Sequence, residues 1–438
     1  MNPSAHSAES QNDGSWHAPV AHERLAAQLH LPASKSLTNR ELVLAALADG
    51  PSLLRSPLHS RDSALMVEAL RALGATITEV PGSGKFGADL EVGPISDSGD
   101  AFIDCGLAGT AMRFLPQLAA LRTGSVTFDG DPAARRRPMQ TTILALRALG
   151  VLVDDGDRGT LPFTVHGTGA VAGGQLEIDA SASSQFVSGL LLAGAHFTNG
   201  LELIHVGERL PSEPHIEMTL EALRRRGVDA ASKGAGRWSV RPGPIAARES
   251  TIEPDLSNAA PFLAAALAAG GSVSIADWPA ETTQVGAQLA HLLPQFGGAV
   301  TVEHGVCTAT GDGSLRGADI DLSEAGELAP TLAALAMLAS TPSRLRGIGH
   351  IRGHETDRLQ ALVVNGEAVG SQIRETEDGL AIEPAPLHGG AWKAFEDHRI
   401  ATAGALIGLR TPGVSVDDID ATAKTIPEFA ALWKQMLL

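Results

Sequence analysis

The chain has 438 residues, of which 44% are hydrophobic, and this predicts a folded protein of two or more domains with a large core. Its formal net charge of −17 argues against nucleic-acid binding, so an anionic ligand would need a local group of Lys and Arg. The only cysteines, Cys105 and Cys307, are too few for a disulfide framework and fit a cytoplasmic protein.

The N-terminal segment shows no regular hydrophobic pattern. Residues 1–20 are rich in Ser, Asn, Gly and Pro, with neither a basic start nor an apolar stretch. We therefore expect a disordered tail instead of a secretory signal. No apolar run later in the chain approaches the length of a membrane span.

One structural unit then recurs along the chain. An Ala- and Leu-rich helix ends at a Gly or Pro turn and a β-type run follows, and these turns lie about 70 residues apart, which indicates an internal repeat. The turns are at Gly50, Gly124, Gly200, Gly271, Pro342 and Gly413. A second helix ending follows the first five, at Gly74, Gly150, Gly227, Gly298 and Gly370. The pattern predicts six α/β units, each of strand, helix, strand, helix and short strands.

Six units predict an α/β protein of two pseudo-symmetric domains, each with three units. We expect units 1–3 to occupy residues 34–252, and units 4–6 to occupy residues 253–438 together with 21–33. The chain would cross between the domains near residues 32–34 and 248–253.

Two further segments can be interpreted from their surroundings. The sixth unit has no strands after its last helix, and the run at residues 25–32 is a candidate to complete it. GSGKFG at residues 82–87 precedes a strand-like run instead of a helix, so it predicts a hairpin tip and neither a dinucleotide site nor a P-loop.

The predicted helix starts carry an unusual set of charged residues. Helix N-termini present free N–H groups and stabilise anions, so a cation there is disfavoured. Most Ser, Thr and Asp at these starts are ordinary caps. The basic residues are not explained in this way; they are Lys35, Arg40, Arg113, Arg137, Arg358, Arg399 and Lys424. We expect them to cluster and to bind two or three anionic groups.

Two carboxylates lie near the same starts. Glu327 and Glu355 are available for proton transfer beside bound anions, which is the usual second requirement of an enzyme site. Stabilisation of the helix dipole would also explain Glu327 on its own.

Seven motifs between Leu31 and Phe429 resemble, in order, those of 5-enolpyruvylshikimate-3-phosphate (EPSP) synthases, an enolpyruvyl transferase family. They read LPASKSLTNRELVLAALA, GLAGTAMRFLP, GDPAARRRPM, SASSQFVSGLLLA, RGHETDRL, FEDHRIATAGAL and TAKTIPEF. The resemblance implies two domains, each of three βαβαββ units around buried helices, an inside-out α/β arrangement. It also implies transfer of the enolpyruvyl group of phosphoenolpyruvate to the 5-hydroxyl of 3-phosphoshikimate, with release of phosphate by addition and elimination, in aromatic amino acid biosynthesis. Neither a metal nor an organic cofactor is implied, and we expect a monomer that binds no nucleic acid or membrane.

The resemblance further implies roles for individual residues. Those that would bind 3-phosphoshikimate are Lys35, Ser36, Arg40, Ser183, Ser184, Gln185, Ser212, Glu327 and His354. Those that would bind phosphoenolpyruvate are Lys35, Gly109, Arg137, Gln185, Arg358, Arg399 and Lys424. Glu327 would be the base for the 5-hydroxyl, Glu355 the acid for the methylene carbon, and Lys35 a third catalytic group.

The chain departs from the family pattern at four positions. The base is commonly Asp, and Glu327 is one methylene longer. His354 stands where Lys is usual, which weakens a contact to 3-phosphoshikimate or makes it pH-dependent. Leu107 replaces an Asn, and His215 replaces an aromatic residue.

Two other functions remain as alternatives. A UDP-N-acetylglucosamine enolpyruvyl transferase shares the implied fold and chemistry, but it typically has a reactive Cys in the loop that here reads GDPAARRRPM. An RNA-end-processing protein would use the basic runs at residues 135–137 and 224–226, but the acidity and the few aromatic residues oppose this.

The division of the cations between the two halves predicts a motion. We expect 3-phosphoshikimate to bind first and to draw the domains together, completing the phosphoenolpyruvate site. Mutual repulsion among the cations would favour an open form without ligand.

Overall fold

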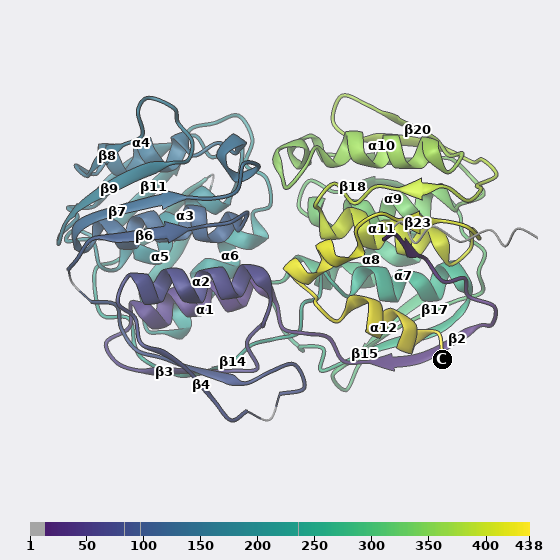
Figure 1. Cartoon of the computed structure of the whole chain (residues 1–438), viewed down its shortest axis with the longest axis horizontal. Coiled ribbons are helices and arrows are strands. Elements are labelled where there is room, and N and C mark those ends of the chain that lie inside the picture. Colours follow the sequence, from purple (N-terminus) through teal and green to yellow (C-terminus); the bar gives the residue numbers. More distant parts are fainter. Residues whose placement is uncertain (1–13, 83, 97, 235) are drawn as a thin grey trace, which may run out of the picture.

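Two lobes lie side by side in the computed structural model, which describes residues 14–82, 84–96, 98–234 and 236–438 (Figure 1). Buried apolar side chains form one large cluster in each lobe. One cluster runs from Leu42 to Ile245, and the other combines Ala18 to Leu31 with Leu256 to Met436. The predicted α/β fold of two similar halves is therefore confirmed, while the exact domain boundaries stay a prediction.

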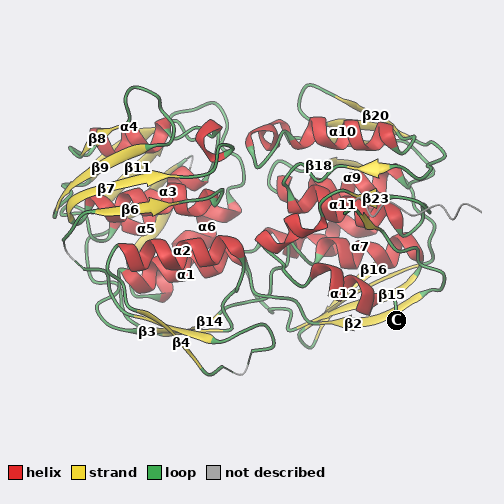
Figure 2. Ribbon diagram, viewed as in Figure 1, coloured by secondary structure: helices red, strands yellow, loops and turns green. Residues whose placement is uncertain are grey.

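A largely buried helix begins each of the six units among the described residues. Apolar residues, chiefly Ala and Leu, fill α7 and α9 on all sides and so require burial, whereas α1 also buries the polar residues Asn39, Arg40 and Glu41. Figure 2 shows α3 and α5 in the middle of one lobe and α9 and α11 in the middle of the other, with strands towards the periphery. The six are α1 (Lys35–Ala46), α3 (Gly109–Ala120), α5 (Gln185–Gly194), α7 (Ala260–Ala269), α9 (Ala329–Met337) and α11 (His398–Gly408).

A second helix follows in each unit and has a more exposed side. These helices are α2 (Arg61–Ala72), α4 (Gln140–Ala148), α6 (Pro214–Arg225), α8 (Leu289–Leu292), α10 (Arg358–Ala368) and α12 (Phe429–Met436). The full helix predicted in the fourth unit is wrong, because α8 is a single turn between two 3-10 turns. Pro294 lies just after α8, where proline would interrupt an α-helix. No helix in the described ranges is long and apolar enough to cross a lipid bilayer.

The described strands form six small sheets, three in each lobe. In the lobe of α1 to α6 they are β14 (Glu249–Thr251), β3 (Ser52–Arg55), β5 (Asp89–Val92) and β4 (Ile77–Val80); β6 (Ala101–Asp104), β7 (Thr123–Asp129), β9 (Phe163–Thr168) and β8 (Leu152–Asp154); and β10 (Gly174–Ile178), β11 (Leu201–His205), β13 (Arg237–Val240) and β12 (Ala230–Gly234). In the other lobe they are β2 (Leu25–Leu29), β15 (Gly271–Ala276), β17 (Val306–Gly311) and β16 (Ala299–Glu303); β18 (Asp319–Asp321), β19 (Ser343–Arg346), β21 (Leu380–Glu383) and β20 (Gln372–Glu375); and β1 (Trp16–His17), β23 (Ser415–Val416) and β22 (Ala391–Trp392).

The N-terminal strands correct two expectations. The run at residues 25–32 does not complete the sixth unit, because β2 pairs in parallel with β15 of the fourth. The sixth sheet is completed by β1, which pairs antiparallel with β23. A disordered tail reaching residue 20 is therefore too long, and residues 1–13 lie outside the described part of the chain.

Two extended segments connect the lobes and run side by side. The amide of Ser34 donates to the carbonyl of Glu253 at 2.8 Å, and the amide of Asp255 donates to the carbonyl of Pro32 at 2.9 Å. The strand β14 precedes α7 in the sequence, yet it pairs with β3 at the beginning of the other lobe. The lobe of α1 to α6 thus begins and ends at the same place.

The GSGKFG segment joins the antiparallel strands β4 and β5. The predicted hairpin is thus confirmed, although residue 83 lies outside the described ranges. No helix follows the segment, so it carries no dinucleotide-binding element.

Close packing of α3 against α5 depends on Gly189. A Cβ at this position would lie 2.2 Å from the carbonyl oxygen of Arg113. We expect Gly189→Ala to lower the free energy of unfolding by about 1–3 kcal/mol, because the two helices must move apart. Urea unfolding would measure this. Gly243→Ala is the matched control, because a Cβ there meets no described atom within 4 Å, and a loss as large as that of Gly189→Ala would contradict the packing argument.

Candidate active site

A cavity of about 350 Å³ lies between the lobes and is lined by helix starts from both. Lys35 begins α1 and Arg399 belongs to the first turn of α11, so cations that are far apart in the sequence face one space. The predicted residues that line it are Lys35, Ser36, Gly109, Arg137, Ser183, Ser184, Gln185, Ser212, Glu327, His354, Glu355, Arg358 and Arg399. The clustering expected from the sequence is thus present.

Two predicted residues do not line the cavity. Arg40 is 1% exposed and donates to Thr219 Oγ1 at 2.8 Å, to the Ser36 carbonyl at 2.9 Å and to the His215 carbonyl at 2.9 Å. These bonds make it a support for the wall behind Ser36. Lys424 is 3% exposed and lies behind Glu355, with its Nζ 3.0 Å from Oε1.

Direct contacts between the lobes border the cavity. The Nε2 atom of His215 lies 3.2 Å from Oε2 of Glu327. The backbone amide of Lys35 donates to Asp255 Oδ2 at 3.2 Å. Arg209 Nη2 donates to the carbonyl of Gly347 at 3.2 Å. Residues of both lobes therefore meet around a single site.

The start of α3 holds two cations that have no carboxylate partner among the described residues. Arg113 Nη1 donates weakly to the carbonyl of Gly109 and to Gln185 Oε1, both at 3.3 Å, and Arg137 Nη1 donates to the carbonyl of Leu107 at 3.3 Å. The Nε atoms of both arginines are buried without a partner in the described structure. Burial and the charge of Arg137 lower the pKa of Arg113 well below its ordinary value.

Gly109 makes this start accessible. No side chain caps α3, and a Cβ at Gly109 would lie 3.0–3.1 Å from guanidinium nitrogens of Arg113 and Arg137. Two cations with unused donors, beside uncapped helix N–H groups, are suited to a phosphate or carboxylate.

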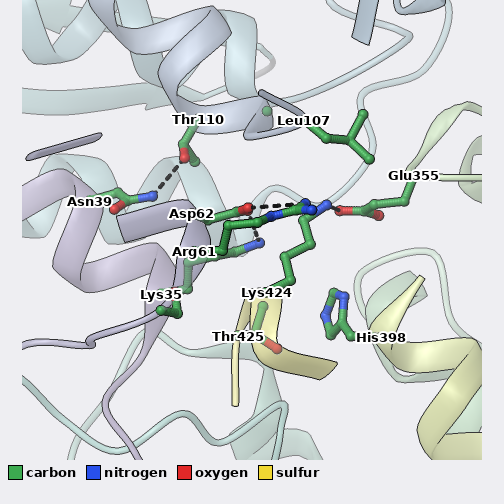
Figure 3. Close-up of polar contacts among 12 residues, drawn as sticks. Lys35, Asn39, Arg61, Asp62, Leu107, Thr110, Glu355, His398, Lys424 and Thr425 are labelled. Carbon is green, nitrogen blue, oxygen red and sulfur yellow. Dashed lines mark hydrogen bonds and ion pairs between the residues drawn. The ribbon is translucent and has the colours of Figure 1, made fainter. Parts of the chain in front are cut away.

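Lys35, Arg358, Arg399 and Lys424 are paired with carboxylates, whereas Arg40 has no carboxylate partner in the described part of the chain. Lys35 Nζ lies 3.2 Å from Asp62 Oδ2, and Lys424 approaches Glu355 (Figure 3). Arg399 Nη2 lies 3.6 Å from Glu327 Oε2. These pairings reduce the expected mutual repulsion at Lys35, Arg399 and Lys424, whereas Arg113 and Arg137 face each other without a carboxylate partner among the described residues. That repulsion favours an open form stays a prediction.

Arg358 forms ion pairs with two carboxylates, Glu355 and Asp397. Its Nε donates to Asp397 Oδ2 at 2.7 Å, and its Nη2 donates to Glu355 Oε2 at 2.8 Å. The arginine is 2% exposed and Asp397 is completely buried. Asp397 also caps α11 by accepting from the amide of Arg399, so one carboxylate orients two predicted ligand residues.

Glu327 is held as a carboxylate. It accepts from Ser257 Oγ at 2.5 Å, and His215 and Arg399 flank its other oxygen. Burial opposes ionisation, yet Arg399, His215 and Ser257 outweigh it and keep the pKa of Glu327 below its ordinary value. Burial lowers the pKa of His215 to about 4, so near neutral pH this imidazole is uncharged.

Glu355 is also ionised. Burial disfavours the charge, but Lys424 and Arg358 hold the pKa of Glu355 well below its ordinary value. An acid must carry a proton, so Glu355 alone does not meet that role in this state. The neighbouring Lys424 ammonium is a proton donor within hydrogen-bond distance.

Several cavity residues were not assigned roles from the sequence. Arg113 was recognised as part of the cationic set only, and Ser257 and Asp255 looked like ordinary helix caps. His398 lines the cavity, and neither ring nitrogen has a hydrogen bond in the described structure, although Nδ1 lies 3.8 Å from Asp397 Oδ1. Each lies at a helix start, and that position is the signal which could have identified them. The described residues contain no group of His, Cys, Asp and Glu arranged to hold a metal ion.

Comparison with known proteins covers nearly the whole chain. Residues 20–433 match the family described as EPSP synthase (3-phosphoshikimate 1-carboxyvinyltransferase). A 3-phosphoshikimate 1-carboxyvinyltransferase of Kocuria rhizophila (strain ATCC 9341 / DSM 348 / NBRC 103217 / DC2201) is 58% identical over 431 residues, which cover 97% of each chain.

Solved structures share the fold. Two structures of EPSP synthase from Acinetobacter baumannii are 24% identical, with TM-scores of 0.78 and 0.77, over 96% of this chain and 97% and 98% of theirs. The enolpyruvyl transferase NikO from Streptomyces tendae is 18% identical over 96% of both chains, with a TM-score of 0.74.

Proposed function

Since the chain belongs to the EPSP synthase family, we propose how its cavity holds the substrates and moves the protons of that reaction. The enzyme is a transferase that moves the enolpyruvyl group of phosphoenolpyruvate to the 5-hydroxyl of 3-phosphoshikimate, a step of aromatic amino acid biosynthesis. The 58% identical relative favours this activity over UDP-N-acetylglucosamine as acceptor and over an RNA substrate.

The anion site at the start of α3 is the observation that carries the placement of phosphoenolpyruvate. Arg137 and Arg113 have unused donors there, and Gly109 leaves room for an oxygen to approach the helix N–H groups. We place the phosphate and carboxylate of phosphoenolpyruvate between this start and the cations of the other lobe. The remaining contacts come from Lys35, Gln185, Arg358 and Arg399, and Lys424 supports this site from behind Glu355.

The lobe of α1 to α6 supplies most of the 3-phosphoshikimate site. Its hydroxyl and amide groups cluster at the starts of α1, α5 and α6 and suit an uncharged or phosphate oxygen. These are Ser36, Ser183, Ser184, Gln185 and Ser212, with Lys35 beside them. Arg40 orients this wall from behind instead of facing the ligand directly. Glu327 and His354 reach the same ligand from the other lobe.

The chemistry follows from the protonation states. Glu327 is an ionised base and takes the proton of the 5-hydroxyl as its oxygen bonds to C2 of phosphoenolpyruvate. The methylene carbon gains a proton, which Glu355 relays from Lys424 or Lys35. Glu355 then takes a proton back from the resulting methyl group while the bond between C2 and the phosphate oxygen breaks, which re-forms the double bond and releases phosphate. Arg137 and Arg399 stabilise the departing charge.

The arrangement of the lobes gives the remaining parts of the proposal. Ligand contacts come from both lobes, so 3-phosphoshikimate binding would draw them together about the two connecting segments. We propose a monomeric enzyme, because the two lobes of one chain together supply the predicted ligand residues and the site does not require a second copy. The buried free thiols of Cys105 and Cys307 fit the cytoplasm.

Phosphate release tests this function. We expect the purified protein to release phosphate from phosphoenolpyruvate only when 3-phosphoshikimate is present, because phosphate can leave only after the acceptor oxygen has added to C2. Coupled detection of inorganic phosphate would measure the rate. UDP-N-acetylglucosamine is the matched control acceptor, and turnover with it, or release without any acceptor, would refute the assignment.

A further inference from the structure

His354 has an unusual partner for a histidine at a binding site. Its Nδ1 atom lies 2.9 Å from Nη1 of Arg358. A guanidinium has only N–H donors, so Nδ1 must accept this hydrogen bond through its lone pair. An imidazolium carries hydrogens on both nitrogens and could not do so.

The guanidinium cannot turn away to relieve this constraint. Two of its nitrogens are committed to Asp397 and Glu355, at 2.7 Å and 2.8 Å, and the side chain is 2% exposed. The position of Nη1 is therefore fixed, and with it the orientation of the His354 ring.

The other ring nitrogen is available to a ligand. His354 lines the cavity, and its Nε2 has no hydrogen-bond partner among the described residues. We propose that His354 is a neutral imidazole with its one ring N–H on Nε2, and that this N–H donates to a hydroxyl oxygen of the substrate.

The charges around His354 agree with this geometry. The groups that face it are Arg358 and Glu355 from its own segment, the ring of His350 at 5.7 Å between centroids, and Arg137 from the other lobe. Burial and Arg358 lower the pKa of His354 well below its ordinary value. The negative charge of Glu355 would raise the pKa of His354, but this charge is already paired with the cations Lys424 and Arg358.

A neutral His354 would give the cavity an uncharged hydrogen-bond donor beside its charged ones. Arginine and lysine serve the phosphate and carboxylate groups, whereas a neutral N–H suits a ring hydroxyl, which carries no charge. A lysine at this position could not accept from Arg358 and would add a cation beside it. The pH-dependent contact that the sequence suggested at His354 is thus replaced by one that is constant near neutral pH. Only this contact to a hydroxyl rests on the proposed function.

Nuclear magnetic resonance of protein labelled with ¹⁵N-histidine tests the tautomer without any substrate. We expect the ring nitrogens of His354 to show the neutral Nε2–H form from pH 8 to pH 5.5, with the signal assigned by its loss in His354→Gln. Protonation within that range, or a proton on Nδ1, would overturn the proposal even if the enzyme is fully active.

Two variants test the contact to the substrate. Glutamine keeps one acceptor and one donor, so we expect His354→Gln to weaken 3-phosphoshikimate binding by roughly threefold or less, whereas His354→Phe, which has neither, weakens it by about tenfold or more. Calorimetric titration at pH 6 and pH 8 would give similar losses at both values. Equal losses in the two variants, or a loss that appears at only one pH, would refute the donor role while leaving the phosphate-release result untouched.

Discussion

Replacing Glu327 by Gln lowers turnover at least ~100-fold while the affinity for 3-phosphoshikimate changes little, because the amide keeps the shape of the side chain and loses the ability to take a proton. The carboxylate is ready for this task, since Ser257 donates to it at 2.5 Å and Arg399 keeps it charged. Steady-state kinetics together with calorimetric binding would separate the two effects. The acid limb of the kcat profile should lie below the ordinary pKa of glutamate, since the pKa of Glu327 is lowered.

Glu324→Gln is the matched control for this variant. It removes a carboxylate three residues earlier that does not line the cavity, and the amide oxygen of glutamine can still accept from the backbone of Glu213, so turnover should stay within about twofold of the unmodified enzyme. Near-normal turnover in Glu327→Gln would show that another group takes the proton.

Arg358→Met should lower the free energy of unfolding by roughly 3–5 kcal/mol, which is the usual result of removing one partner from a buried ion pair. The variant leaves Asp397, which is completely buried, without its cation, and it also removes a partner of Glu355. The loss of charge pairing comes without a large change in side-chain volume. Urea unfolding monitored by circular dichroism would measure the difference.

Arg352→Met provides the comparison, because that arginine lies in the same segment and is also paired with carboxylates, Glu375 and Asp357. Its side chain is 36% exposed, so we expect a loss of about 1 kcal/mol or less. Similar losses for the two variants would mean that burial of the Arg358 network has no energetic consequence.

The internal repeat allowed the fold to be predicted from the sequence. Helix endings recur at a nearly constant spacing, and the apolar composition of α3, α7 and α9 requires burial, so local patterns specify both the elements and their inner position. The choice of strand partners was not accessible in this way. β2 precedes α1 but pairs with β15, and nothing in LAAQL distinguishes that partner from another edge.

The location of the site could also be predicted from the sequence. Cations at helix starts predicted that Lys35 and Arg399 would share a cavity, because a start that carries the wrong charge needs a ligand to explain it. The side-chain pairings could not be predicted from the sequence, since they depend on residues that only the folded chain brings together. The burial of Arg40 behind Ser36 and the bond from Arg358 to His354 both belong to this class.

The lobe of α1 to α6 is one continuous segment of the chain, which begins near Ser34 and ends beside it near Glu253. A ribosome makes the chain from the N-terminus, so the lobe of α1 to α6 is complete once β14 has emerged, and it can fold while translation continues. The first strands, β1 and β2, must meanwhile wait for β23 and β15. The nascent protein would therefore carry one finished lobe beside unpaired strand edges until the second lobe has been translated.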